Sequence, residues 1–162
     1  MTEPTAAPTA EPTLVTIEPV TTAVIRGEVP MDRLPEFFDS SFGALGPAVQ
    51  QQDAGIAGPA FALYHRMPTD SVDLEVGFPT LRAVQESGDV RASSLPGGRV
   101  ARLVHAGSFD GLVGAWQRLG GWIAEQGLQP QESAFWEVYL TEPSPDMDPA
   151  DLRTELNWPL VG

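Results

Sequence analysis

Hydrophobic and polar residues follow an order that occurs twice along the chain. Residues 14–29 favour an extended strand, interrupted at Pro19. A helical pattern follows, because apolar residues recur there at steps of three and four. That apolar stripe comprises Leu34, Phe37, Phe38, Phe42, Leu45 and Val49. Two more extended runs, 60–66 and 71–80, complete the first unit, and the second run alternates apolar with polar residues as a half-buried strand does.

Local signals predict where the first helix begins and ends. Asp32 is placed to cap its start, and Gly55 is placed to follow its last turn. Pro47 lies within the apolar stripe and lacks a backbone N–H, so we expect it to kink the helix or end it early. The turn residues at 67–70 predict a hairpin between the two extended runs.

The second unit repeats this order. A strand at 99–106 precedes a helix that Ser108 can cap and Gly127 can end, and strands at 134–141 and 152–160 follow. The helix carries an apolar stripe of Leu112, Trp116, Leu119 and Ile123. Two segments of the first unit align with the second, FALY with WEVY and EVGFP with ELNWP, at 61–64 with 136–139 and 75–79 with 155–159.

Two strand–helix–strand–strand units predict an α+β fold. We expect a curved antiparallel sheet with pseudo-two-fold symmetry and a central cleft. The repeats should occupy about 13–80 and 99–161, joined by a polar connector at 81–98, and together they form one ligand-binding domain over 13–162. Residues 1–12 contain only Met, Thr, Glu, Pro and Ala, which predicts a disordered tail.

Composition narrows the function. The 22 acidic residues exceed the nine basic ones, for a formal charge of −13, which disfavours binding to nucleic acid. The chain has no cysteine and only His65 and His105, so we expect neither a disulfide nor a metal or other cofactor. No apolar run is long enough for a membrane span and the N-terminus has no signal-peptide features, so we expect a cytoplasmic protein.

Glu137 is the candidate for chemistry. Strand alternation places it on one face with Phe135 and Tyr139. The opposite face, Trp136, Val138 and Leu140, is wholly apolar, and we expect that face to pack against a helix.

A carboxylate among aromatic rings on a strand with little other charge predicts a dry site and a raised pKa. A cationic ligand would relieve the cost of burying the charge, and aromatic faces would attract it further. The alternative is that Glu137 is exposed or pairs with an arginine, namely Arg66, Arg102 or Arg153. The first unit has Ala62 at the equivalent position, so the fold of the unit does not require the carboxylate.

Several segments carry a resemblance to a known family: GPAFALYH at 58–65, HAGSF at 105–109, FWEVY at 135–139 and RTELNWPL at 153–160. Over about 13–161 the chain resembles the GyrI-like superfamily, the effector-binding domain of drug-sensing bacterial regulators. The resemblance implies the two-repeat fold, with a cleft for aromatic and often cationic compounds. It places the family's buried acidic residue on Glu137 and a pocket tyrosine on Tyr139 or Tyr64. Phe135 shares the face of Glu137, and Phe38 and Phe42 of the first helix are candidates to close the cleft.

The regulators of this superfamily also carry a DNA-binding domain, which this sequence lacks. We therefore expect a stand-alone protein of the actinobacterial type, for binding or sequestering many drugs and protecting against xenobiotics. One alternative implied by the family is a hydrolase of cyclopropane-containing alkylating toxins, with Glu137 and Tyr64 or Tyr139 as its catalytic groups. A second alternative is an interaction or inhibitor module that docks through its acidic face. The sequence makes no prediction of oligomeric state.

Overall fold

The computed structural model describes residues 11–131, 134–141 and 148–161. Strands are labelled β, α-helices α and 3-10 turns η. The elements are β1 Thr13–Ile17, β2 Val20–Pro30, η1 Met31–Arg33, α1 Leu34–Gln51, β3 Phe61–Tyr64, β4 Ser71–Pro79, β5 Arg91–Leu95, β6 Gly98–Ala106, η2 Phe109–Gly111, α2 Leu112–Glu125, β7 Phe135–Tyr139, η3 Pro149–Asp151 and β8 Arg153–Pro159.

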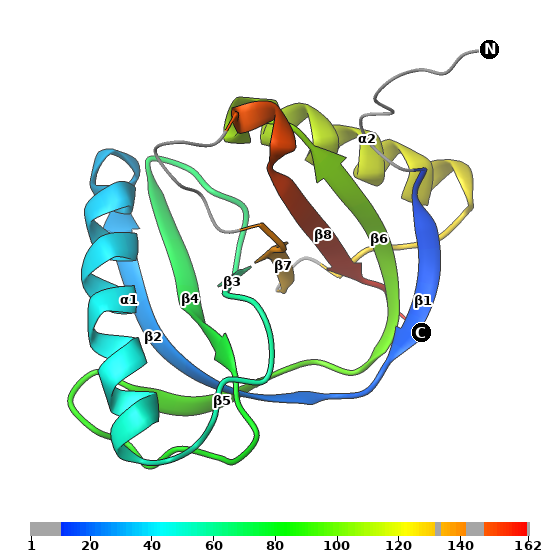
Figure 1. The fold of residues 1–162 in the computed structure, drawn as a ribbon. Coiled ribbons are helices and arrows are strands. Elements are labelled where there is room, and N and C mark those ends of the chain that lie inside the picture. The colour runs from blue at the N-terminus through cyan, green and yellow to red at the C-terminus, as the bar shows by residue number, and fades with distance from the viewer. Residues whose placement is uncertain (1–10, 132–133, 142–147, 162) are drawn as a thin grey trace.

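The described strands form one antiparallel eight-stranded sheet in the order β1-β6-β8-β7-β3-β4-β2-β5 (Figure 1). Exchanging β1 with β5, β6 with β2, β8 with β4 and β7 with β3 gives the same order read from the opposite edge of the sheet. The sheet therefore has a pseudo-two-fold relationship whose centre lies between β3 and β7. This arrangement confirms the predicted α+β fold built from tandem repeats around a curved antiparallel sheet.

The connector between the repeats contains a strand that the sequence did not predict. β5 lies within the predicted connector and pairs with β2, just as β1 pairs with β6. The first strand of each repeat thus lies along the long strand of the other repeat. The chain passes from β1 to β2 at Pro19 and from β5 to β6 at Gly97 without reversing direction, because the β1–β6 and β2–β5 pairings follow one continuous antiparallel register. These two links touch each other, because a Cβ on Gly97 would lie 2.6 Å from Pro19 Cδ.

The first helix differs from prediction at both ends. Asp32 makes no capping hydrogen bond, because the chain passes from β2 directly into η1 and Asp32 lies inside that turn. Pro47 does not end α1, which continues to Gln51, since the buried Leu45 and Val49 on either side hold the helix against the sheet. The terminating residue is Asp53, whose φ is 54°, rather than Gly55.

The second helix confirms one predicted signal and corrects another. Gly127 follows the last turn of α2 with a φ of 70°, and Leu128 N donates to Ile123 O at 3.0 Å. The Ser108 side chain makes no capping hydrogen bond, because α2 begins only after η2. The Ser108 carbonyl oxygen instead lies 2.9 Å from His105 Nε2.

Both helices cover the same face of the sheet. The core beneath α1 includes Phe135 and Tyr139 of β7, which share the face of Glu137, and Trp116 of α2 packs against this core as well as the one beneath α2. Trp136, only 2% exposed, packs in a third core that contains no helical residue, so the prediction that its face meets a helix was wrong. The reason is the curl of the sheet, which covers this side with its own strands. The buried members of that third core are Val24, Phe61, Leu63, Leu95, Val100 and Trp136.

Of the predicted tail, residues 1–10 lie outside the described part of the chain, so the structure does not test it there. Glu11 and Pro12 lie against α2, and the Glu11 carboxylate is 3.0 Å from Arg118. Within the described residues, no helix combines the length and the apolar composition needed to cross a membrane.

Candidate functional site

The Glu137 carboxylate lies on β7 beneath both helices and is only 6% exposed. Both of its oxygens accept a hydrogen bond. Trp116 of α2 donates its indole N–H to Oε2 at 2.8 Å, and Tyr139 donates its hydroxyl to Oε1 at 2.9 Å. The carboxylate is therefore fixed between a helix of the second repeat and a neighbour on its own strand.

Burial raises the pKa of the Glu137 carboxyl above its ordinary value. Hydrogen bonds from Trp116, Tyr139 and Tyr64 lower that pKa in part, as does the nearby charge of His105. Burial together with the adjacent carboxylate raises the pKa of Tyr64 and of Tyr139, so both hydroxyls keep their protons and remain donors. A carboxyl that burial disfavours in its charged form is suited to a cationic partner or to proton transfer.

Aromatic rings surround this group. Tyr64 stacks on Phe135 with ring centroids 5.5 Å apart, and the edge of Trp116 meets Phe135 at 5.3 Å. The Tyr139 ring is met edge-on from both repeats, by Phe38 at 6.3 Å and by Phe109 at 6.0 Å. The rings of both tyrosines and their aromatic neighbours thus lie around the Glu137 carboxylate.

The predicted residues do not all meet. Glu137, Tyr139, Tyr64 and Phe135 lie together, as their shared face predicts. Phe38 reaches this group through Tyr139. Phe42 lies one layer further out, where it stacks on Phe38 at 6.2 Å and meets Phe78 at 5.4 Å.

The arginine alternative for Glu137 is not what the structure shows. Arg66 pairs with Glu28 at 2.9 Å, and Arg102 donates to Asn157 Oδ1 at 2.8 Å. Arg153 donates to the carbonyl oxygens of Ala150 and Leu152. Glu137 is therefore neither exposed nor paired with one of these three cations.

Sequence reasoning missed Trp116 and Phe109. Trp116 belongs to the apolar stripe of α2, which predicts burial but not that its N–H meets a carboxylate. Phe109, 42% exposed, lies in η2 where no periodic pattern exists. The motif HAGSF contains Phe109, so the family resemblance was the one signal that marked it.

A second buried carboxylate lies on the other face of the sheet. Glu75 of β4 accepts a hydrogen bond from Ser93 Oγ at 2.9 Å and lies 2.9 Å from His65 Nε2. Each of its oxygens already has a protein partner. In the described part of the chain, no three His, Asp or Glu side chains come together as a metal site would need.

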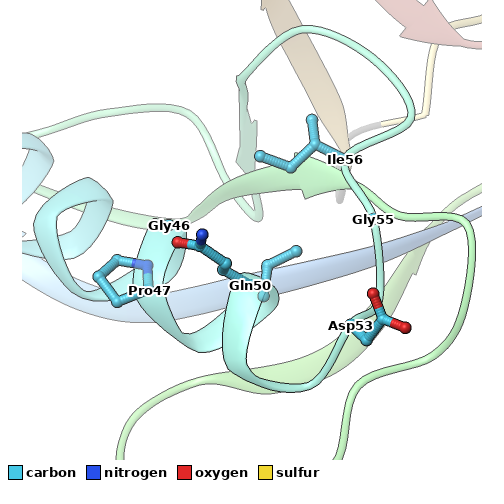
Figure 2. Close-up of a pocket in the computed structure, with 7 residues that line it drawn as sticks. Gly46, Pro47, Gln50, Asp53, Gly55 and Ile56 are labelled. Atoms are coloured by element: carbon cyan, nitrogen blue, oxygen red, sulfur yellow. The ribbon is translucent and has the colours of Figure 1, made fainter.

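Two surface hollows lie away from Glu137. The larger, about 600 Å³, lies between the C-terminal half of α1 and the loop after it. Figure 2 shows Gln50 on the helix with Asp53 and Ile56 on the facing loop. The smaller, about 320 Å³, lies between Glu11 and α2. Neither hollow is lined by a residue of the aromatic group around Glu137.

Comparison with known proteins gives one family match. The model of the GyrI-like small molecule binding domain matches residues 10–161. A comparison with curated proteins finds no match.

Solved structures with low sequence identity share the fold. The EcmrR C-terminal domain superposes with a TM-score of 0.81 at 19% identity, covering 93% of this chain and 97% of that one. SAV2435 bound to tetraphenylphosphonium gives 0.67 at 14% identity, covering 94% and 95%. A structure described as a hydrolase from Listeria innocua gives 0.70 at 13% identity, covering 96% and 94%.

Proposed function

This chain belongs to the family of GyrI-like small molecule binding domains, and on that premise we propose that it binds aromatic cations at Glu137. The observation that carries the proposal is the single buried carboxylate between Trp116 and Tyr139. A small-molecule-binding domain needs an anchor that fixes its ligand, and this group is both charged and enclosed by aromatic rings.

The energetics favour a cation. An ionised carboxylate held away from water is costly, and hydrogen bonds from neutral donors compensate only part of that cost. A ligand cation would supply the missing counter-charge. The rings of Tyr64, Tyr139 and Phe135 would each add cation–π attraction of about 0.5–2 kcal/mol.

Mostly apolar walls with few polar anchors favour broad specificity, so we extend the proposal to binding or sequestering many drugs. The solved structure of SAV2435 holds tetraphenylphosphonium, a compact aromatic cation. That cation is a suitable first probe for this chain, because its charge does not change with pH.

The test is a calorimetric titration of tetraphenylphosphonium into the wild type, Glu137→Gln and Glu75→Gln. We expect Glu137→Gln to weaken binding at least tenfold, about 1.4 kcal/mol. Glu75→Gln is the matched control, because it also neutralises a buried carboxylate but on the opposite face of the sheet. Equal affinities of all three proteins would refute a site at Glu137.

A hydrolase is the second candidate, and the contact between Tyr139 and Glu137 favours it. A carboxyl with a raised pKa beside a hydroxyl donor is suited to general base and acid work. Glu137 would take a proton from water as the water oxygen attacks a strained cyclopropane carbon. The ring C–C bond would break, and the opened product would take up the proton, with Tyr139 or Tyr64 donating a hydrogen bond to it.

Mass spectrometry separates the two candidates. The protein is incubated with a cyclopropane-containing alkylating compound, and a product heavier by one water is sought. Turnover that Glu137→Gln abolishes would establish the hydrolase. Binding without turnover across several such compounds would leave the binding function alone.

A further inference from the structure

The row of side chains beside Glu137 contains a hydroxyl with no protein partner. Thr154 of β8 is fully buried, and its Oγ1 makes no hydrogen bond within the described structure. Buried polar atoms are almost always hydrogen-bonded, so such an atom is a mark of a site that something else completes. The two other hydroxyls of this kind, on Thr22 and Thr80, lie near each other at the far end of β4, where Thr22 pairs with Pro79.

Strand register places Thr154 inside the candidate site. It lies directly opposite Tyr139 on β7 and directly opposite His105 on β6. Directly opposed residues share one face of the sheet, here the face beneath the helices. Thr154 is therefore next to the tyrosine that donates to Glu137.

His105 is held firmly at the other end of this row. Its Nε2 lies 2.9 Å from Ser108 O, and because a carbonyl oxygen only accepts, Nε2 carries the proton. Nδ1 is then the ring nitrogen that remains for a second hydrogen bond. The ring also packs on Gly111, where a Cβ would lie 2.8 Å from His105 Cε1.

The first repeat shows that the fold does not need these polar groups. There the equivalent row is Gly27, Leu74 and Tyr64, paired in the same register. Only the tyrosine is shared. Histidine and threonine stand in place of glycine and leucine only in the row that contains Tyr139.

We propose that Thr154 and His105 form the hydrogen-bonding end of the ligand site. The preferred ligand is then an aromatic cation that also carries an uncharged hydroxyl, carbonyl or amine group on the side of β8 and β6. A ligand hydroxyl both donates and accepts, so it can accept from Thr154 Oγ1 and form a second hydrogen bond with His105 Nδ1. This inference rests on the proposed binding function and adds a selectivity to it.

The test uses two phosphonium cations that differ only in one substituent. Each is triphenylphosphonium with a fourth phenyl ring, which carries a hydroxymethyl group in one compound and an ethyl group of almost the same size in the other. Calorimetry gives both dissociation constants for the wild type, Thr154→Val and Thr154→Ser. Valine keeps the shape of threonine without the hydroxyl, and the leucine of the first repeat shows that an apolar residue is tolerated there.

The wild type should bind the hydroxymethyl compound at least about fivefold more tightly than the ethyl compound. Thr154→Val should remove this preference while its affinity for the ethyl compound stays within about twofold of the wild type. Thr154→Ser should retain the preference. A wild type with no preference, or a preference that survives in Thr154→Val, would overturn the inference and leave binding at Glu137 intact. Failure of the wild type to bind either cation would overturn the proposed function and this inference with it.

Discussion

Ala62 lies directly opposite Glu137 where β3 pairs with β7, and the two residues are each other's counterparts in the repeat. The pseudo-two-fold axis therefore passes through this pair. A residue on the axis meets its own counterpart, so a carboxylate in one repeat requires a small neutral residue in the other.

A carboxylate at the counterpart position should conflict with Glu137. We expect Ala62→Asp to lower the free energy of unfolding at pH 7 by at least about 3 kcal/mol, because two carboxylates would share one buried site. Urea unfolding followed by tryptophan fluorescence measures this loss. The loss should shrink toward pH 4, where one proton can be shared. Ala62→Asn, similar in size but uncharged, is the control, and an equal loss from both variants at pH 7 would contradict the charge explanation.

The raised pKa of Glu137 predicts a pH dependence of stability with a definite sign. A carboxyl whose pKa is higher in the folded state binds its proton more tightly there, so ionising it destabilises the fold. The free energy of unfolding of the wild type, relative to Glu137→Gln, should fall as pH rises from about 4.5 through the raised pKa. The fall is about 1.4 kcal/mol for each unit by which the pKa is raised. Urea titrations of both proteins from pH 4 to pH 8 measure it, and a constant difference would show that the pKa is not raised.

Trp116 and Trp158 offer a matched pair for the indole hydrogen bond. Trp116→Phe removes the donor to Glu137 Oε2 but keeps an aromatic ring. We expect a loss of about 1–3 kcal/mol in stability and a higher pKa for Glu137. The affinity for tetraphenylphosphonium should rise as Glu137 ionises. In this variant the rise should therefore occur at a higher pH than in the wild type.

Trp158→Phe is the control for that shift. Its indole N–H donates to Gln131 O at 2.8 Å, so the variant also loses a part-buried indole hydrogen bond but not one to the carboxylate. Its stability should fall while the pH range of binding stays that of the wild type. The same shift in both variants would mean that Trp116 acts through packing alone.

Gly97 should tolerate no side chain. A Cβ there would lie 2.6 Å from Pro19 Cδ, where the link between β1 and β2 touches the link between β5 and β6. We expect Gly97→Ala to lower the free energy of unfolding by about 1–3 kcal/mol through overpacking. Gly114→Ala, on an exposed turn of α2 with open space around its Cβ, should instead raise it by up to about 1 kcal/mol. Thermal unfolding of both variants gives the two signs, and destabilisation by both would point to a general intolerance of alanine.

Strand periodicity was enough to place Phe135, Glu137 and Tyr139 on one face, because side chains alternate strictly along a strand. It was not enough to say what covers that face. The curl of the sheet decides this, and the curl depends on pairing between β5 and β2 that leaves no periodic trace in the polar connector. The helices therefore lie over Glu137, and strands lie over Trp136.

Local rules failed where packing outweighed them. Pro47 removes one hydrogen bond from α1, but the burial of Leu45 and Val49 holds the helix together across it. The contact of Trp116 with Glu137 is long-range, joining a helix to a strand that follows it, and the helical stripe records only that Trp116 faces inward. Thr154 lies in the segment RTELNWPL that carries the family resemblance. Only the three-dimensional structure shows that its hydroxyl has no hydrogen-bond partner within the described residues.

The exchange of first strands between the repeats bears on the ancestry of the fold. In a chain of half this length, the first strand would have no pairing partner in its own sheet, and one edge of the long strand would be unpaired. Two copies would complete each other by donating that strand reciprocally, and they would meet through a pair of short strands about a true symmetry axis. Gene duplication of such a dimer would yield this protein, and only after the copies were joined could a lone acidic residue appear on the axis without facing its twin.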